Sequence, residues 1–227
     1  MRWTDDFVML FFPVNCLICG KRLSAPGEVI CLSCELKMPL TGYTHKQGNP
    51  VEMGFWGRVP VEQSTSLFRF EKGSAYQSLL HQLKYKGNRK VGIYLGNLLG
   101  YELKHSSFAA CDLIVPVPLH KKRLRQRGYN QSEIIARGAS AIMNIPVEAN
   151  LLIRNVHRDS QTAMGRYERF KNVAGSFRIA AEAPDINRKK VLLMDDVLTT
   201  GATLEACCQT LFRTYSCLVY IATVCCA

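Results

Sequence analysis

Residues 191–203 constrain the fold more than any other stretch of this chain. Val191 to Met194 are four apolar residues in a row, typical of a strand buried in a parallel sheet that is covered on both faces. Asp195 and Asp196 follow where we expect this strand to end, before a turn rich in threonine and a helix-like run from Leu204 to Thr214. The stretch therefore predicts a strand, a turn and a helix, with two carboxylates at the junction.

The predicted turn suits an anion bound beside a polyhydroxyl group. A helix points unpaired N–H groups and the positive end of its dipole back at the preceding turn, and small hydroxyl residues let an anion approach closely. The adjacent carboxylates favour sugar hydroxyls together with magnesium. A sugar phosphate meets both requirements.

Three kinds of site compete with a sugar-phosphate site for this motif. Receiver domains of response regulators carry an Asp pair after an apolar strand, but near the start of the domain, whereas this pair lies near the end of the chain. A Walker A loop needs a lysine that this turn lacks. An ordinary Asp-capped helix stays open as a purely structural interpretation, although it gives no reason for two neighbouring carboxylates before Thr-Thr-Gly-Ala-Thr.

The chain is strongly basic, and much of the charge is concentrated in one place. It has 29 Lys and Arg against 18 Asp and Glu, a net charge of +11. This excess suggests polyanionic partners, whether nucleic acid, diphosphates or an acidic membrane surface. Five basic residues fall between Lys121 and Arg127, directly after the expected strand end Leu113 to Pro118. Such a dense cluster either faces phosphates or is a solvated basic loop.

Four of the ten cysteines are spaced for a metal ion. Cys16 and Cys19 form one Cys-x-x-Cys pair, and Cys31 and Cys34 form a second after a stretch with Pro and Gly. Two such pairs complete the closed tetrahedral site that structural zinc favours. A thioredoxin-like redox motif needs only one pair. Because all four positions are filled by protein, we expect zinc without catalysis.

The remaining pattern predicts a small module followed by an α/β domain. We expect a zinc-ribbon module and linker over residues 1–58, with residues 42–57 as linker or loop, and an α/β domain with a parallel sheet over residues 59–227. Asn130 with Glu133 three residues later indicates a capping-box-like helix start. The expected strands are 63–71, 113–118, 151–154, 176–179, 191–194 and 218–224, and the expected helices are 76–85, 91–103, 132–143 and 204–214.

The N-terminal residues do not resemble a signal peptide. The apolar run is preceded by Asp5 and Asp6 rather than by basic residues, and it is too short to span a bilayer. A short amphipathic helix packed on the body is favoured, because four apolar residues fall near one helical face: Trp3, Phe7, Leu10 and Phe11. No transmembrane segment appears elsewhere in the sequence. We therefore expect a cytoplasmic protein.

Residues 191–203 resemble the signature with which type I phosphoribosyltransferases bind phosphoribosyl diphosphate (PRPP). The resemblance implies that Asp195 and Asp196 hold the ribose 2′- and 3′-hydroxyls at the catalytic centre, with Mg²⁺ bound alongside PRPP. It implies that the turn binds the 5′-phosphate and that a segment after another strand contacts the diphosphate. The turn residues are Thr199, Thr200, Gly201, Ala202 and Thr203, and the diphosphate residues are Val117, Pro118, Leu119 and His120.

Nearly the whole chain, in order, resembles the ComF family, also called the GntX-like amidophosphoribosyltransferase-related proteins. The matching elements are the four-cysteine finger, Tyr85-Lys86-Gly87, Pro116 to Leu119, Arg127 to Gln131, Arg158 to Thr162, Arg169 to Asn172, and the Asp195-Asp196 motif. The resemblance implies an α/β fold with a type I phosphoribosyltransferase-like parallel sheet flanked by helices and a small N-terminal zinc ribbon. Family members are implicated in natural transformation, where they handle single-stranded DNA as it enters the cytoplasm.

The resemblance leaves two functions open. The first is a ComF-like protein that binds PRPP with Mg²⁺, binds single-stranded DNA and acts with the DNA-uptake machinery, its transferase activity being undecided. The second is a nucleotide-salvage or biosynthetic phosphoribosyltransferase with no role in DNA uptake. No residue identifies an acceptor substrate. The residues assigned to DNA are Lys121, Lys122, Arg123, Arg125, Arg127 and Tyr129.

Overall fold

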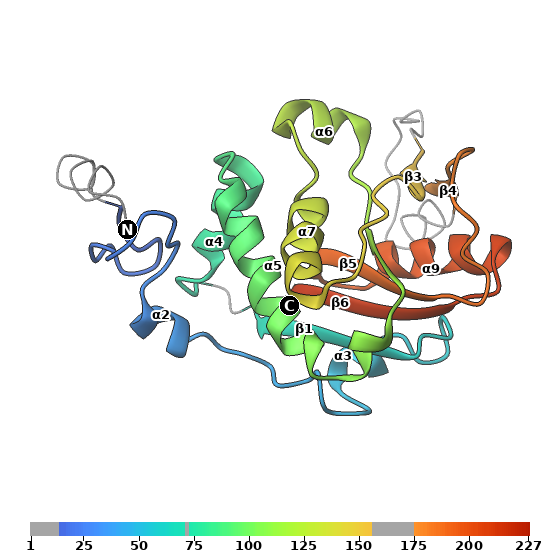
Figure 1. Cartoon of the computed structure of the whole chain (residues 1–227), viewed down its shortest axis with the longest axis horizontal. Helices are drawn as coiled ribbons and strands as arrows, with labels where there is room; N and C mark the ends of the chain where they lie inside the picture. The colour runs from blue at the N-terminus through green and yellow to red at the C-terminus, as the bar shows by residue number, and fades with distance from the viewer. Residues whose placement is uncertain (1–13, 71–72, 156–174) are drawn as a thin grey trace, which may run out of the picture.

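A computed structural model describes residues 14–70, 73–155 and 175–227 (Figure 1). Two sequence predictions lie outside these residues. They are the amphipathic helix near the N-terminus and the polar stretch from Arg158 to Asn172. No helix in the described part of the chain has both the length and the apolar character that crossing a membrane requires.

Four parallel strands form the central sheet, in the order β1-β6-β5-β2. Leu193 of β5 pairs with Val115 of β2 on one side and with Ile221 of β6 on the other. Fully buried apolar runs in β5 and β6 explain why these strands are central, because both of their faces are covered. The strand bounds are Gln63–Arg69 for β1, Leu113–Pro116 for β2, Lys190–Leu198 for β5 and Leu218–Cys226 for β6.

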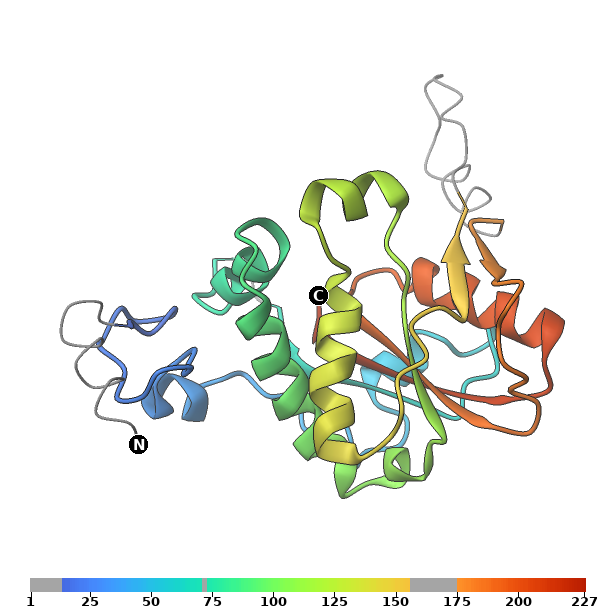
Figure 2. The same ribbon diagram turned by 45° about the horizontal axis from the view of Figure 1, so that its top comes forward.

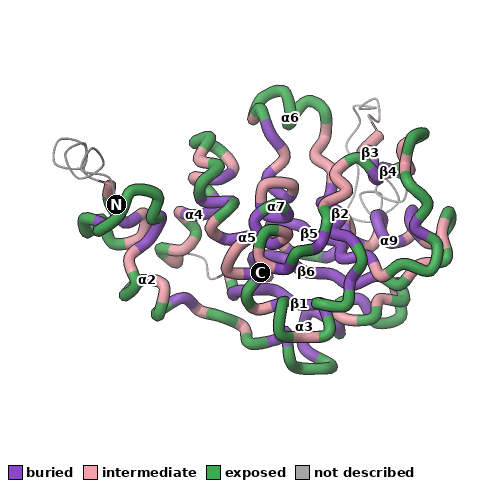
Figure 3. The backbone as a smooth tube through the Cα atoms, in the orientation of Figure 1, coloured by how far each residue is buried: buried purple, intermediate pink, exposed green. Residues whose placement is uncertain are grey.

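Helices cover both faces of this sheet, which confirms the predicted parallel sheet flanked by helices. One apolar core joins Met194 and Ala222 to α4, α5 and α7, and the other joins Leu193 and Ile221 to α9. Figure 3 shows the buried strands between these layers. The helix bounds are Gln77–Tyr85 for α4, Arg89–Lys104 for α5, Gln131–Met143 for α7 and Ala202–Thr214 for α9.

Helices α5 and α7 approach each other closely because both carry glycine at the contact. A Cβ atom at Gly96 would lie 2.1 Å from the carbonyl oxygen of Ile135, and one at Gly138 would lie 2.5 Å from that of Ile93. Neither position has room for a side chain. This contact fixes α7, whose first turn reaches the acidic pair.

The expected strands at 151–154 and 176–179 form, but not in the parallel sheet. Leu152–Arg154 (β3) and Phe177–Ile179 (β4) pair antiparallel as a separate two-stranded sheet. The prediction of parallel strands joined by crossovers is therefore wrong for these two segments. Short runs of three residues carry too little pattern to identify the partner strand.

Residues 42–57 are more than the linker that the sequence predicted. Pro50–Met53 form a short helix, α3, capped by the side chain of Asn49, and Val51 and Phe55 lie buried in the core with α9. The preceding helix α2, Leu32–Leu36, belongs to the cysteine-containing segment, which shares the other core with α4 and α5. The domain division at residues 58 and 59 stays a prediction.

Candidate functional site

The acidic pair lies inside strand β5 rather than after its end. Pairing with β6 continues through Leu198, so the prediction that the strand ends before the carboxylates is wrong. Asp195 is 9% exposed and Asp196 is 5% exposed. Both carboxylates are thus largely withdrawn from water, and each has its own partner.

Asp195 is held by the start of helix α7. The hydroxyl of Ser132 donates to Asp195 Oδ1 over 2.7 Å, and the backbone N–H of Asp196 donates to the same oxygen over 2.9 Å. Burial and the neighbouring Asp196 carboxylate together raise the pKa of Asp195 to about 7, against the opposing effect of these hydrogen bonds. The folded protein therefore holds a proton on Asp195 more tightly than an unperturbed carboxyl group would.

Asp196 is paired with Lys84 from the last turn of α4. The ammonium nitrogen lies 2.9 Å from Asp196 Oδ2, and the side chains are 24% and 7% exposed. This carboxylate oxygen accepts no hydrogen bond of good geometry in the described part of the chain. The pair is consequently an ionic contact in a mostly dry environment, and Lys84 neutralises Asp196.

One small cavity of about 30 Å³ is lined by Asp195 and residues 197–204, which include the predicted phosphate turn. Gly201 has φ +76°, a left-handed conformation that favours glycine, and α9 begins at the next residue. Ala202 N–H donates to Thr200 Oγ1 over 3.4 Å, and the N–H groups of Thr203 and Leu204 find no acceptor among the described residues. The arrangement leaves donors at a helix N-terminus directed at this cavity.

Arg58, the last residue of the predicted module and linker (residues 1–58), fixes this turn. Its guanidinium donates to the carbonyl oxygen of Thr200 over 3.0 Å and to Glu205 of α9 over 2.9 Å. Phe55 packs below the turn, so that a Cβ atom at Gly201 would lie 3.2 Å from its ring. Sequence reasoning missed both residues, because neither belongs to a motif and their partners lie far along the chain.

The predicted diphosphate segment lies beside the acidic pair. Val117 N–H donates to Met194 O over 2.9 Å, so the hydrogen bonding between β2 and β5 continues up to the residue before Asp195. Val117 is buried, whereas Pro118, Leu119 and His120 are half-buried. Asn130 at the start of α7 donates to Val117 O over 3.0 Å. The ends of β2 and β5 therefore bring residues 117–120 and Asp195 to the same edge of the sheet.

The basic run forms a helix rather than a loop. Helix α6 spans Lys121–Arg127, begins at His120, whose Nδ1 accepts from Lys122 N–H over 3.2 Å, and ends at Gly128 with φ +77°. None of its residues is buried, and it stands away from the sheet (Figure 2). Lys121, Lys122, Arg123 and Arg125 are exposed, and Arg127 is half-buried.

Tyr129, predicted to contact DNA with this run, lies in the core. It is 7% exposed, its hydroxyl donates to Leu83 O, and the Arg89 guanidinium covers its ring at 4.9 Å. A base has no access to this ring in the present arrangement. The exposed tyrosine nearby is Tyr85, at 69%, with the Arg127 guanidinium 5.7 Å from its ring centroid.

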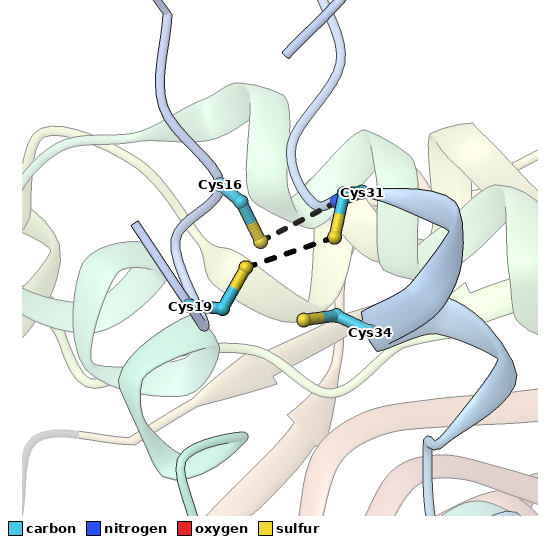
Figure 4. Close-up of side chains that lie close together, drawn as sticks. All are labelled: Cys16, Cys19, Cys31 and Cys34. Carbon is cyan, nitrogen blue, oxygen red and sulfur yellow. Dashed lines mark hydrogen bonds between the residues drawn. The ribbon is translucent and has the colours of Figure 1, made fainter. Parts of the chain in front are cut away.

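The four predicted metal ligands converge (Figure 4). The sulfur atoms of Cys16, Cys19, Cys31 and Cys34 all lie within 4.8 Å of one another, and those of Cys19 and Cys31 are 3.7 Å apart. A tetrahedral zinc ion with bonds of about 2.3 Å needs sulfur atoms roughly 3.8 Å apart. The cluster has the donors and the spacing for structural zinc.

Backbone hydrogen bonds favour the thiolate form of one of these ligands. Cys31 N–H donates to Cys16 Sγ over 3.4 Å. Although burial acts in the opposite direction, donors from the backbone of Cys19, Cys31 and Ile18 lower the pKa of Cys16 to about 6. A thiolate is the form that binds a metal ion.

No protein-family model matches the chain, but curated proteins do. Competence protein F of Haemophilus influenzae is 24% identical over 87% of this chain and 90% of its own length. DNA utilization protein YhgH of Escherichia coli K12 is 28% identical over 65% of each chain, so the chain spans just under two thirds of that relative. Competence protein ComFC of Bacillus subtilis is 25% identical over 84% of this chain and 85% of its own length.

Two solved structures resemble the chain at a TM-score of 0.40. Glutamine PRPP amidotransferase of B. subtilis is 21% identical over 59% of this chain and 26% of its own. Adenine phosphoribosyltransferase of Leishmania tarentolae is 12% identical over 80% of this chain and 89% of its own. The relatives among the curated proteins confirm the resemblance stated from the motifs: the chain is a homologue of competence protein F, ComFC and DNA utilization protein YhgH.

Proposed function

We propose that this protein binds PRPP with Mg²⁺ at the junction of β5 and α9 and that it acts in DNA uptake. One observation carries the first part. Asp195 and the turn Thr199–Thr203, chosen from the sequence for the ribose and the phosphate, line the same cavity at a helix N-terminus. The names of its relatives, competence proteins and DNA utilization proteins, support the second part.

Each group of residues has a distinct role in the proposed site. The free N–H groups of Thr203 and Leu204 and the threonine hydroxyls bind the 5′-phosphate. Asp195 and Asp196 orient the ribose through its hydroxyls, and residues 117–120, at the end of the adjacent strand, contact the diphosphate. Because both carboxylates are buried, a ribose reaches them only when Ser132 and Lys84 give up part of their contact.

Mg²⁺ suits the acidic pair. Carboxylate oxygens are the ligands that this ion prefers in proteins, and the ion would take the place of the Lys84 ammonium group, which lies 2.9 Å from Asp196 Oδ2. When bound, the ion neutralises charge on the diphosphate. Asp195 and Asp196 are the residues that would hold it.

Helix α6 is the proposed contact with single-stranded DNA. Five basic residues in seven, four of them exposed, face no acidic partner in the ion pairs of the described residues. The phosphates of a single DNA strand would supply the negative charge that these residues lack, and their binding releases counterions. The helix follows directly from residues 117–120, so the DNA contact and the diphosphate contact are parts of one continuous segment.

The test of PRPP binding compares the parent protein with a double variant that combines Asp195→Asn and Asp196→Asn. PRPP with Mg²⁺ should raise the melting temperature of the parent protein and leave that of the double variant unchanged. Glu182→Gln, at an exposed carboxylate, is the control and should behave as the parent. Equal stabilisation of the double variant and the parent would exclude this site.

A transformation assay on a strain with the same double variant tests the role in DNA uptake. Transformation should fall when protein abundance is unchanged. If PRPP binding is lost but transformation stays normal, the protein is a salvage or biosynthetic phosphoribosyltransferase instead.

A further inference from the structure

A large cavity of about 560 Å³ borders the proposed sugar-phosphate site. It lies along helix α4, against the ends of β5 and β6. The volume is in the range of small-molecule pockets, which is roughly 300–1,000 Å³. The lining residues that bear on its ligand are Gln77, His81, Lys84, Tyr85, Val197 and Thr199.

Two residues connect this cavity to the sugar-phosphate site. Thr199 belongs both to the cavity wall and to the lining of the phosphate cavity. Lys84 belongs to the wall and forms the ion pair with Asp196. A ligand held by Asp196 and the phosphate turn is therefore within reach of the cavity along α4.

The cavity and the diphosphate segment lie on opposite sides of β5. Strand β5 has β2, which precedes residues 117–120, on one side and β6 on the other. The cavity is lined by Ala227, at the end of β6, and by α4. A pentose over the end of β5 thus has anion-binding residues on one side and this cavity on the other.

The α4 wall presents an aromatic surface to the cavity. Gln77, His81 and Tyr85 follow one another at intervals of four residues, which places them on one face of the helix. The His81 and Tyr85 rings lie 5.1 Å apart at 44°, and all three side chains are exposed. Two rings provide a surface for stacking, and the Gln77 amide and the imidazole provide donors and acceptors.

Buried leucines and two hydrogen bonds fix the position of this wall. Leu79 and Leu83 of α4 are fully buried. The Tyr76 hydroxyl donates to Cys34 O over 2.6 Å, and the Ser78 hydroxyl donates to Leu17 O over 3.1 Å. The cysteine-containing segment therefore braces the helix that carries the exposed rings.

We propose that the cavity along α4 binds a nucleobase, with His81 and Tyr85 as the stacking surface. A planar heterocycle with hydrogen-bonding edges matches both the rings and the polar groups of the wall. The inference rests on the proposed function, because the base would be joined to a sugar phosphate in the neighbouring site. The source of the base is either a free 5′-nucleotide or a nucleotide of a DNA strand.

The experiment uses the full chain and three ligands: ribose 5-phosphate, 5′-mononucleotides such as AMP and UMP, and a short single-stranded oligodeoxynucleotide. Calorimetry measures the affinity of each for the parent, for a double variant with His81→Leu and Tyr85→Leu, and for Tyr101→Leu. Tyr101 is an exposed tyrosine of α5 outside the cavity and serves as the control. Ribose 5-phosphate should bind the parent and both variants equally.

A mononucleotide should bind the parent about tenfold or more tightly than ribose 5-phosphate, and the double variant should lose this gain. If only the oligodeoxynucleotide loses affinity in the double variant, the base belongs to a strand. If neither ligand depends on His81 and Tyr85 while ribose 5-phosphate still binds, the nucleobase site is excluded and the proposed function stands. If ribose 5-phosphate does not bind the parent here, and PRPP does not stabilise it in the melting experiment described above, both proposals are overturned.

Discussion

The ammonium group of Lys84 lies 2.9 Å from Asp196 Oδ2, and so helix α4 and strand β5 meet at the acidic pair. Removing one partner leaves the other charge buried without compensation. Lys84→Met should therefore lower the free energy of unfolding by roughly 2–4 kcal/mol. Urea denaturation measures this change.

Two further variants separate the ion pair from other effects of Lys84. Adding Asp196→Asn to Lys84→Met should recover part of the loss, because no unpaired charge then remains. Lys90→Met, at an exposed lysine of α5, should change stability by less than about 0.5 kcal/mol. A double variant that is as unstable as the sum of its single variants would show that the contact contributes nothing.

The raised pKa of Asp195 makes stability depend on pH. Its pKa is about 7 in the folded protein against 3.8 for an unperturbed group, so the folded state holds the proton more tightly. The contribution of Asp195 is most favourable below about pH 4 and is lost as pH rises through about 7. Asp195→Asn should remove this dependence and should increase stability at pH 8 by about 1–3 kcal/mol.

Urea denaturation of parent and Asp195→Asn at pH 5 and pH 8 tests this prediction. Glu182→Gln, which alters an exposed carboxylate, should keep the pH dependence of the parent. An Asp195→Asn variant with an unchanged pH dependence would contradict the assignment.

Arg58 should stabilise the phosphate turn. It is 28% exposed in the side chain and bonds both Thr200 O and Glu205, whose side chain is 13% exposed. Arg58→Gln should cost roughly 1–3 kcal/mol and weaken PRPP binding, because the turn loses its support. Arg137→Gln breaks an exposed pair with Glu133 and should cost no more than about 0.5 kcal/mol.

The cysteine cluster should hold about one zinc ion per chain. Cys16→Ser should abolish the bound metal and loosen the contacts of α4 with Cys34 and Leu17, which lowers the melting temperature. Cys217→Ser, at a half-buried cysteine outside the cluster, should keep the zinc. Elemental analysis of purified protein decides the point, and a folded metal-free protein would contradict it.

Local pattern was sufficient for most elements of the sheet and for the metal ligands. The apolar run before Asp195 identified β5, and the cysteine spacing identified all four converging sulfur atoms. Both signals are contained in short segments. The sequence placed the end of β5 too early, because the strand continues past the Asp pair through its pairing with β6. Two buried carboxylates inside a strand need partners, and Ser132 and Lys84 come from distant segments.

The contacts that complete the site depend on long-range packing. Arg58 reaches Thr200 from a segment without any motif, and Lys84, which directly precedes the motif Tyr85-Lys86-Gly87, reaches Asp196 from far along the chain. The burial of Tyr129 also depends on distant residues: its basic neighbours in the sequence suggested an exposed ring, but Leu83 and Arg89 enclose it. Such partners become visible only when the fold brings distant segments together.

Helix α6 carries its charges at spacings that oppose its own stability. Lys121 and Arg125, and likewise Arg123 and Arg127, are like charges one helical turn apart, and no apolar side chain of this seven-residue helix is buried. So short a helix is marginal in water by itself. The helical content of α6 should therefore rise when a polyanion neutralises its charges. A spectroscopic measurement of helical content would then show directly whether a polyanion is bound to α6.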